Sequence, residues 1–155
     1  MHGQPRYLLA LTSTFSLQKM IIFFISDLHL DDSRPQITEL FEQFLHTEAR
    51  QAKALYILGD LFESWVGDDD DTPLTTTIAE NLRALSNSGV PCYFMHGNRD
   101  FLLGKRYAEQ AGITLLPEQQ VVQLYGQNYL ISHGDEMFPA DVSYQRFRRI
   151  IRCRL

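Results

Sequence analysis

The chain has 155 residues, 45% of them hydrophobic, which is about the size of one domain and enough apolar material for a single packed core. Its formal net charge of -5 argues against nucleic acid as a partner, because nucleic-acid binders usually present a basic face. Cys92 and Cys153 lie far apart and match no metal-ligand spacing, so we expect no disulfide framework and a reducing, cytoplasmic environment. No run approaches the roughly 20 apolar residues that span a bilayer.

The N-terminal segment differs from the rest of the chain. Residues 1–19 contain only a short apolar patch and no small-residue cleavage pattern, which argues against a signal peptide. Met20 directly precedes the first strand-like run, so we expect residues 1–19 to be a disordered upstream extension and Met20 to be the natural start. Residues 20–155 are expected to form one domain, because no repeat, low-complexity segment or linker divides them.

Apolar runs and amphipathic stretches alternate along this domain. Met20–Ser26 is apolar almost throughout, which is the pattern of a strand buried on both faces. Pro35 then opens an amphipathic helix that we expect to continue through Lys53. The alternation predicts a layered α/β sheet. The later elements are expected as strands at 54–58, 91–95 and 113–116, helices at 73–87 and 105–110, and a hairpin with arms at 121–125 and 129–133 around a Gly126-Gln127 turn.

Four of the expected strands end in polar groups, and in α/β sheets the ligand crevice lies beyond the carboxyl ends of strands. Asp27 and His29 are two residues apart, so in an extended chain both side chains can reach one ion. The whole set offers carboxylate, amide and imidazole ligands without thiolate, which suits Mn, Fe or Zn better than Ca or a lone Mg. We therefore expect a metal site formed by Asp27, His29, Asp60, Asn98 and His133.

The same residues indicate the reaction. Asp60 follows Gly59, which permits a sharp turn, and its two oxygens could bridge two cations. Two cations about 3.5–4 Å apart activate a bridging water and stabilise charge during in-line displacement, which predicts hydrolysis at phosphorus. Arg99, next to the expected ligand Asn98, is expected to clamp a phosphate oxygen. Each Asp or His taken singly is more often a cap or a structural residue, but the four clusters together favour the metal site.

Several residues near these motifs have competing interpretations. We expect His96 to be a supporting or structural residue rather than a ligand, and Glu63 to support the site rather than bind metal. The acidic run 68–71 is expected to be a solvated loop or a helix-start feature. Trp65 fits either the core or a pocket wall.

The blocks DLH, GDLFE, GN and HGD, in this order, resemble the calcineurin-like metallophosphoesterase superfamily. Longer strings at residues 54–70, 89–112 and 131–138 are similar to the branch that acts on UDP-2,3-diacylglucosamine in lipid A synthesis. Many superfamily members have GNH[DE], whereas this chain has GNRD at residues 97–100, and Arg at this place is a feature of that branch. The resemblance covers about residues 20–149.

The resemblance implies a layered β-sheet sandwich flanked by helices, with two metal ions, by resemblance Mn²⁺, in the full-length family. It implies hydrolysis of the pyrophosphate bond of UDP-2,3-diacylglucosamine to UMP and 2,3-diacylglucosamine 1-phosphate, at the cytoplasmic face of a Gram-negative inner membrane. The expected metal ligands fall on the family's metal positions. Asn98, Arg99 and Asp141 fall on its substrate contacts.

The chain departs from the family pattern at its C-terminal end. A GHTH block with two further His ligands and a helical insertion that shapes the acyl-chain pocket are absent, so we expect an incomplete centre in a chain that ends early. The run 147–155 fits either the start of a basic amphipathic helix for a membrane surface or the result of a frameshift. Two alternatives stay open: a related metal-dependent phosphodiesterase or nucleotide pyrophosphatase, and a non-catalytic remnant.

Overall fold

The computed structural model describes residues 21–135. The expected extension at 1–19, Asp141, Cys153 and the run 147–155 therefore lie outside the described residues. Within them, four parallel strands form one sheet in chain order: β1 (Ile22–Ile25), β2 (Ala54–Leu58), β3 (Cys92–Met95) and β4 (Thr114–Leu115).

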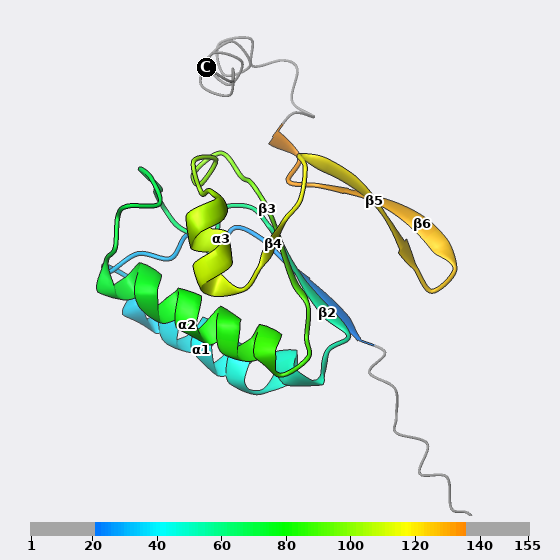
Figure 1. Ribbon diagram of the computed structural model, residues 1–155, viewed down its shortest axis with the longest axis horizontal. Helices are drawn as coiled ribbons and strands as arrows, with labels where there is room; N and C mark the ends of the chain where they lie inside the picture. The colour runs from blue at the N-terminus through cyan, green and yellow to red at the C-terminus, as the bar shows by residue number, and fades with distance from the viewer. Residues whose placement is uncertain (1–20, 136–155) are drawn as a thin grey trace, which may run out of the picture.

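Three helices connect these strands and lie together on one face of the sheet (Figure 1). They are α1 (Pro35–His46), α2 (Pro73–Asn87) and α3 (Lys105–Ala111). Pro35 and Pro73 each open a helix, and the Thr72 side chain completes the start of α2 in a capping box with Thr75. The mixed α/β class expected from the sequence is confirmed. No helix within residues 21–135 is long and apolar enough to cross a membrane.

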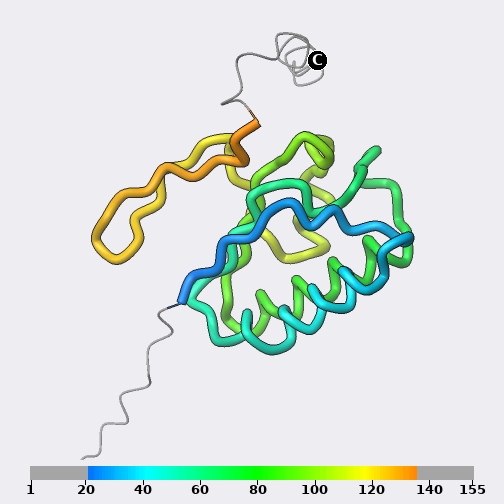
Figure 2. Tube along the Cα trace, turned by 180° about the vertical axis from the view of Figure 1, so that it is seen from behind, coloured from blue at the N-terminus to red at the C-terminus, as the bar shows by residue number. Residues whose placement is uncertain are grey.

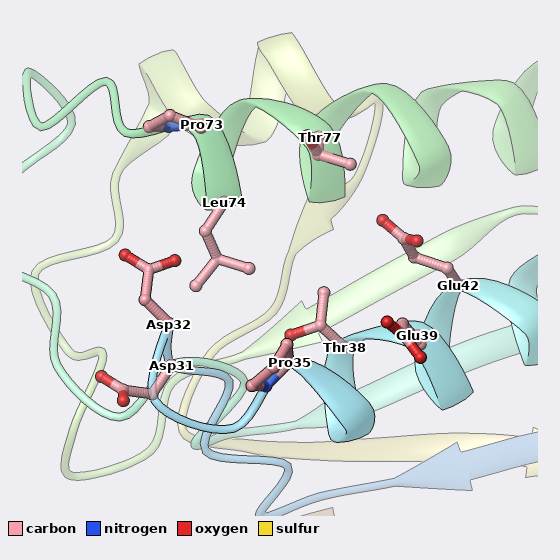
Figure 3. Close-up of a pocket in the computed structure, with 9 residues that line it drawn as sticks. All are labelled: Asp31, Asp32, Pro35, Thr38, Glu39, Glu42, Pro73, Leu74 and Thr77. Atoms are coloured by element: carbon pink, nitrogen blue, oxygen red, sulfur yellow. The ribbon is translucent and has the colours of Figure 1, made fainter.

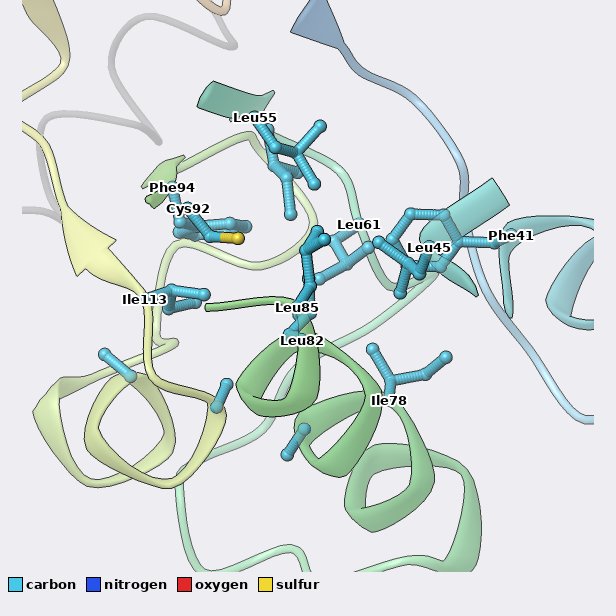
Figure 4. Packing of buried hydrophobic residues seen from close by; sticks show 14 of the residues in the cluster. Phe41, Leu45, Leu55, Leu61, Ile78, Leu82, Leu85, Cys92, Phe94 and Ile113 are labelled. Carbon is cyan, nitrogen blue, oxygen red and sulfur yellow. The ribbon is translucent and has the colours of Figure 1, made fainter. Parts of the chain in front are cut away.

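The main core lies between the sheet and these helices. Leu55 and Phe94 point to the helices and are fully buried (Figure 4). Ile57, two residues after Leu55 on the same face of β2, belongs to the same buried cluster. Their neighbours Tyr56 and Met95 point to the other face, where they form a smaller cluster with Ala54 and Ile131. The central strand β2 is therefore apolar on both faces, as its continuous apolar run predicts.

The second face meets an antiparallel hairpin of β5 (Gln119–Leu124) and β6 (Gln127–Ser132), which projects from the body (Figures 1 and 2). Its turn is Tyr125-Gly126, one residue earlier than expected. Both turn residues have positive φ, 50° and 83°, which is the conformation that a two-residue hairpin turn favours. Within residues 21–135, this hairpin is the only part of a second sheet.

Two further sequence expectations were wrong in detail. Helix α1 ends at His46 rather than Lys53, because Thr47 leaves helical geometry with φ -115° and ψ -89°. A short 3-10 helix, Glu48–Gln51, follows. Strand β1 is only partly buried, because it lies at the sheet edge and Phe24 remains 40% exposed against Tyr56.

Candidate metal centre

The segments that follow β1 and β2 run side by side and hold three of the expected ligands together. The Asp27 amide donates to the Gly59 carbonyl at 3.1 Å, and the His29 amide donates to the Asp60 carbonyl at 2.9 Å. Asp27, His29 and Asp60 all have positive φ, of 56°, 50° and 53°. Such conformations cost about 1–3 kcal/mol each and cluster at functional sites, so the backbone here is shaped to place these side chains.

Two glycines allow the segments to approach one another. A Cβ on Gly97 would lie 2.0 Å from Asp60 Oδ1, and a Cβ on Gly59 would lie 2.6 Å from the Gly97 Cα and 2.7 Å from His133 Nδ1. Side chains at either position would displace the proposed ligands. Gly59 also has a φ of 89°, which glycine adopts without strain.

Asp60 is the central residue of the arrangement. It is buried, at 3% exposed, and its Oδ1 accepts the Arg99 amide at 2.9 Å. Its Oδ2 faces two imidazole nitrogens, His29 Nε2 at 3.8 Å and His133 Nε2 at 3.7 Å. From the sequence, both oxygens of Asp60 were expected to bridge two cations. In the structure, Oδ1 accepts a backbone amide, and Oδ2 is the atom turned toward both imidazoles.

His133 presents its Nε2 to this cluster. Its Nδ1 lies 2.7 Å from the Leu58 carbonyl, which can only accept, so Nδ1 carries a proton and Nε2 is the nitrogen left to bind a metal. That Nε2 lies 3.3 Å from Asn98 Oδ1 and 3.7 Å from Asp60 Oδ2. One nitrogen and two oxygens that converge in this way are suitable ligands for a cation.

His29 is arranged in the same way on the other side of Asp60. Its Nε2 faces Asp27 Oδ1 at 3.9 Å and Asp60 Oδ2 at 3.8 Å. Its Nδ1 is buried and lies 3.1 Å from Glu63 Oε2, although the direction is not that of a good hydrogen bond. The structure therefore offers Nδ1 an anionic partner and leaves Nε2 toward the cluster.

All five expected ligands thus come together, from the ends of β1, β2, β3 and β6. Ligand atoms of Asp27, Asp60 and His133 lie within 4.8 Å of one another. The mixture of carboxylate oxygens, imidazole nitrogens and an amide oxygen fits a divalent transition metal, and the central place of Asp60 fits two such ions. The side chains that converge here therefore fit the divalent metal site that the sequence predicts.

Arg99 and Glu63 lie at the rim of the cluster. The Arg99 side chain is 51% exposed, and its Nη1 is 3.6 Å from Glu63 Oε1. Glu63 makes its close contacts with cationic or imidazole groups rather than with the other carboxylates. Its position matches the expected supporting role, and the phosphate-clamping role of Arg99 stays a prediction.

Asp100 supports the site from beneath, and the sequence analysis did not single it out. Its side chain is fully buried and accepts backbone amides of Gly97 at 2.9 Å, Leu61 at 2.7 Å and Asp60 at 3.3 Å. Burial raises the pKa of the Asp100 carboxyl, and the bonds from Gly97 and Leu61 oppose that shift. Asp100 joins the loops after β2 and β3 that carry Asp60 and Asn98; its place in the GNRD string was the only available signal.

The other residues with competing interpretations are structural. His96 Nε2 lies 2.7 Å from the Leu103 carbonyl. Trp65 is buried against Tyr107, with ring centroids 4.6 Å apart, and belongs to the core. Asp68 is a helix-start feature, but of α3 rather than the adjacent helix, because its two oxygens accept the amides of Gly104 at 2.7 Å and Tyr107 at 3.2 Å.

A separate groove of about 240 Å³ lies between the starts of α1 and α2 (Figure 3). Four carboxylates, of Asp31, Asp32, Glu39 and Glu42, line it together with Pro and Thr residues. None of the expected metal ligands lines this groove. The candidate centre instead lies at the carboxyl edge of the sheet, where the sequence analysis places it.

Comparisons with known proteins agree with this geometry. The sequence model of the calcineurin-like phosphoesterase family matches residues 20–151. UDP-2,3-diacylglucosamine hydrolases of Escherichia coli O7:K1 and Escherichia fergusonii are each 59% identical to the chain over 129 residues, which cover 83% of this chain and 54% of the relative. The chain therefore spans about half the length of these curated relatives.

Among solved structures, the nuclease MPE of Pseudomonas putida covers 66% of this chain and 49% of its own, with 15% identity and a TM-score of 0.48. A likeness at that level adds no argument. The family model, by contrast, spans most of the chain and all five expected ligands. The resemblance seen in the four sequence blocks is thereby confirmed, and the chain belongs to the calcineurin-like phosphoesterase family.

Proposed function

We propose that this chain hydrolyses the pyrophosphate bond of UDP-2,3-diacylglucosamine, with Mn²⁺ held by Asp27, His29, Asp60, Asn98 and His133. The observation that carries the proposal is the convergence of these side chains around Asp60 Oδ2, with both imidazoles presenting Nε2 to it. The substrate class comes from the curated relatives, whose name is UDP-2,3-diacylglucosamine hydrolase. The expected products are UMP and 2,3-diacylglucosamine 1-phosphate, a step of lipid A synthesis.

The residues of the chain have distinct parts in this reaction. When bound, divalent cations supply Lewis-acid activation of water and of the phosphoryl group. Asp60 orients its Oδ2 to both sides of the centre because Oδ1 is fixed by the Arg99 amide. Asn98 supplies a neutral oxygen, which limits the negative charge that the substrate's phosphates meet. Arg99 has an exposed set of guanidinium donors beside the centre, and we assign it to a phosphate oxygen of the substrate. Asp141 is assigned as a separate contact with the substrate.

The place of action belongs to the same proposal. A substrate with two acyl chains and a charged head group resides at a membrane surface, so the enzyme would act as a peripheral protein at the cytoplasmic face of the inner membrane. Nucleic acid has no part in it, in keeping with the net charge of -5.

The direct test is a Mn²⁺-dependent assay of UMP release from UDP-2,3-diacylglucosamine by the 155-residue chain. We expect UMP and the sugar phosphate in equal amounts, loss of turnover with EDTA and recovery with added Mn²⁺. Asp60→Asn, purified in parallel, must lose the activity, which excludes a contaminating host enzyme. Arg99→Ala should lose turnover while keeping Mn²⁺ binding, because Arg99 contacts the substrate rather than the metal.

The same assay separates the two alternatives. Hydrolysis of bis-p-nitrophenyl phosphate without hydrolysis of the UDP-lipid would instead identify a related phosphodiesterase. Mn²⁺ binding without turnover of either substrate would identify a non-catalytic metal-binding protein. Either result would overturn the proposed activity.

A further inference from the structure

The Glu63 carboxylate contacts three groups from three separate segments. Its Oε2 lies 3.1 Å from His29 Nδ1 and 3.3 Å from Arg34 Nη2, and its Oε1 lies 3.6 Å from Arg99 Nη1. His29 follows β1, Arg34 precedes α1, and Arg99 follows β3. One side chain therefore connects a proposed metal ligand, a proposed phosphate clamp and the start of a helix.

Arg34 completes this group. It is the residue before α1, and its guanidinium has no acceptor with which to cap the helix. Its Nη2 instead donates to the His29 carbonyl at 2.5 Å as well as to Glu63 at 3.3 Å. His29 has a φ of 50°, so Arg34 fixes the carbonyl of a residue in a strained conformation.

The Glu63 carboxylate lies 3.1 Å from His29 Nδ1, outside hydrogen-bond geometry. An anionic oxygen at this distance still favours, through its charge, the tautomer with the proton on Nδ1. The lone pair of Nε2 then faces Asp27 Oδ1 at 3.9 Å and Asp60 Oδ2 at 3.8 Å. On the opposite side of the centre, the Leu58 carbonyl does the same for His133. The tautomers of the two imidazoles thus have different partners: a backbone carbonyl for His133 and a side-chain carboxylate for His29.

The contact between Glu63 and Arg99 affects the orientation of the Arg99 side chain more than the folding stability of the chain. Both side chains are well exposed, 51% and 38%, and ion pairs of this kind contribute little to folding. A carboxylate on one side of a guanidinium nevertheless restricts where its remaining donors point. Those donors are left for an anion at the rim of the centre.

We propose that Glu63 and Arg34 are positioning residues of the metal centre: Glu63 sets the tautomer of His29 and restrains Arg99, and Arg34 holds Glu63 and the His29 carbonyl in place. The proposal rests on the proposed function only in taking His29 as a metal ligand. A purely structural link between the loops would make a different prediction, because it would change folding stability without changing the His29 tautomer.

The first test is ¹⁵N NMR of the imidazoles in the metal-free 155-residue chain at about pH 8.5, above the ordinary pKa range of imidazoles. The His29 signals are assigned by their absence in His29→Gln. We expect the proton on Nδ1 in the original chain and a shift toward protonated Nε2 in Glu63→Ala. Glu80→Ala, which removes an exposed carboxylate on α2, should leave the tautomer unchanged. A folded Glu63→Ala chain with the original His29 tautomer would overturn the proposal.

The second test is Mn²⁺ affinity by calorimetry. Loss of a partner behind a metal-ligating imidazole typically costs 10–100-fold in affinity, so we expect Glu63→Gln to bind about tenfold more weakly. Arg34→Gln should weaken binding by a smaller factor, with partial rescue in Arg34→Lys, and Glu80→Gln should bind as the original chain does. Equal affinity in Glu63→Gln and Glu80→Gln would contradict the positioning role.

The two tests also separate this proposal from the proposed function. An original chain that binds no Mn²⁺ would sink the metal centre, and the tautomer measurement would still decide whether Glu63 sets His29. Conversely, normal Mn²⁺ affinity and turnover in Glu63→Ala would leave the proposed function intact and remove the role of Glu63.

Discussion

Asp60 shows how a single buried carboxylate can serve several loops at once. Its Oδ1 is occupied by the Arg99 amide, and its own amide lies 3.3 Å from Asp100 Oδ1. Fixed from both ends, the side chain has little freedom to turn Oδ2 away from the two imidazoles. Such preorganisation matters for a metal site, because ligands that must first be ordered bind the ion more weakly.

Gly97 provides a test at this scale. In Gly97→Ala the new Cβ would meet Asp60 Oδ1 at 2.0 Å, so the loop must shift and the free energy of unfolding should fall by about 1–3 kcal/mol. Mn²⁺ affinity should fall with it, because Asp60 moves. Denaturant titration and calorimetry measure the two effects.

Gly89→Ala is the matched control for that variant. Gly89 has a φ of 88° but nothing within 4 Å of an added Cβ, so the variant should lose about 1 kcal/mol through backbone strain alone and keep its Mn²⁺ affinity. Unchanged Mn²⁺ affinity in Gly97→Ala would show that the close approach is not needed for the centre.

Cys92 gives a prediction that depends on pH. Burial raises the pKa of the Cys92 thiol to about 12, so the folded chain holds the proton more tightly than the unfolded chain does. The stability this provides is complete below the unfolded pKa, near 9.0, and is lost as the pH rises toward 12.

In a Cys153→Ser background, Cys92 is therefore expected not to react with a thiol reagent at about pH 8 in the native state, and to react fully in denaturant. Rapid reaction of the native chain would contradict the buried position. Between pH 9 and 12, the free energy of unfolding of the Cys92→Ala variant should fall less than that of the chain that keeps Cys92.

At the scale of elements, long-range caps matter as much as local ones. The N-cap of helix α3 is Gly104, which has no side chain, and Asp68, 36 residues earlier in the chain, supplies the missing acceptors. Asp68→Ala removes acceptors for Gly104, Tyr107 and the Trp65 indole. We expect a loss of about 1–2 kcal/mol in the free energy of unfolding.

Asp69→Ala is the control for the cap. Asp69 is exposed, and its substitution removes the same negative charge one position along the chain. Its effect should stay within about 0.5 kcal/mol. Equal losses in the two variants would mean that charge, rather than the bonds of Asp68, is responsible.

The elements themselves were largely predictable, because apolar runs and Pro-initiated amphipathic stretches are local signals. Their ends were not: Thr47 leaves helical geometry within an amphipathic pattern that continues to Lys53, and the hairpin turn depends on Tyr125 adopting positive φ. The five expected ligands could be named because each stands at the end of a strand. Asp100 and Arg34 could not, since their partners lie in other loops and no spacing in the sequence reveals them.

At the scale of the whole molecule, the two faces of the sheet differ in how the described residues 21–135 cover them. The helices bury one face, whereas the other carries a stack of Phe24, Tyr56 and Tyr93. Beside it, a largely apolar groove of about 590 Å³ lies between Phe24 and the hairpin, lined by residues that include Tyr129 and Leu130. Exposed apolar surface of this kind promotes association.

The 155-residue chain should therefore bind an apolar dye such as anilinonaphthalene sulfonate and associate as its concentration rises. Leu130→Lys, at a position that is 58% exposed, should reduce both effects. Leu40→Lys changes a leucine of similar exposure on α1, at 65%, and should leave both effects nearly unchanged. Dye fluorescence and sedimentation velocity provide the measurements, and equal behaviour of the two variants would exclude the groove as the cause.

The central claim is that the ends of four strands form one metal centre around Asp60. Calorimetric titration of Mn²⁺ into the 155-residue chain and into Asp60→Asn tests it most directly, with Asp69→Asn as a control of equal charge. We expect saturable binding in the original chain and in Asp69→Asn, and loss of that binding in Asp60→Asn. Equal Mn²⁺ affinity in all three chains, or none in any of them, would contradict it.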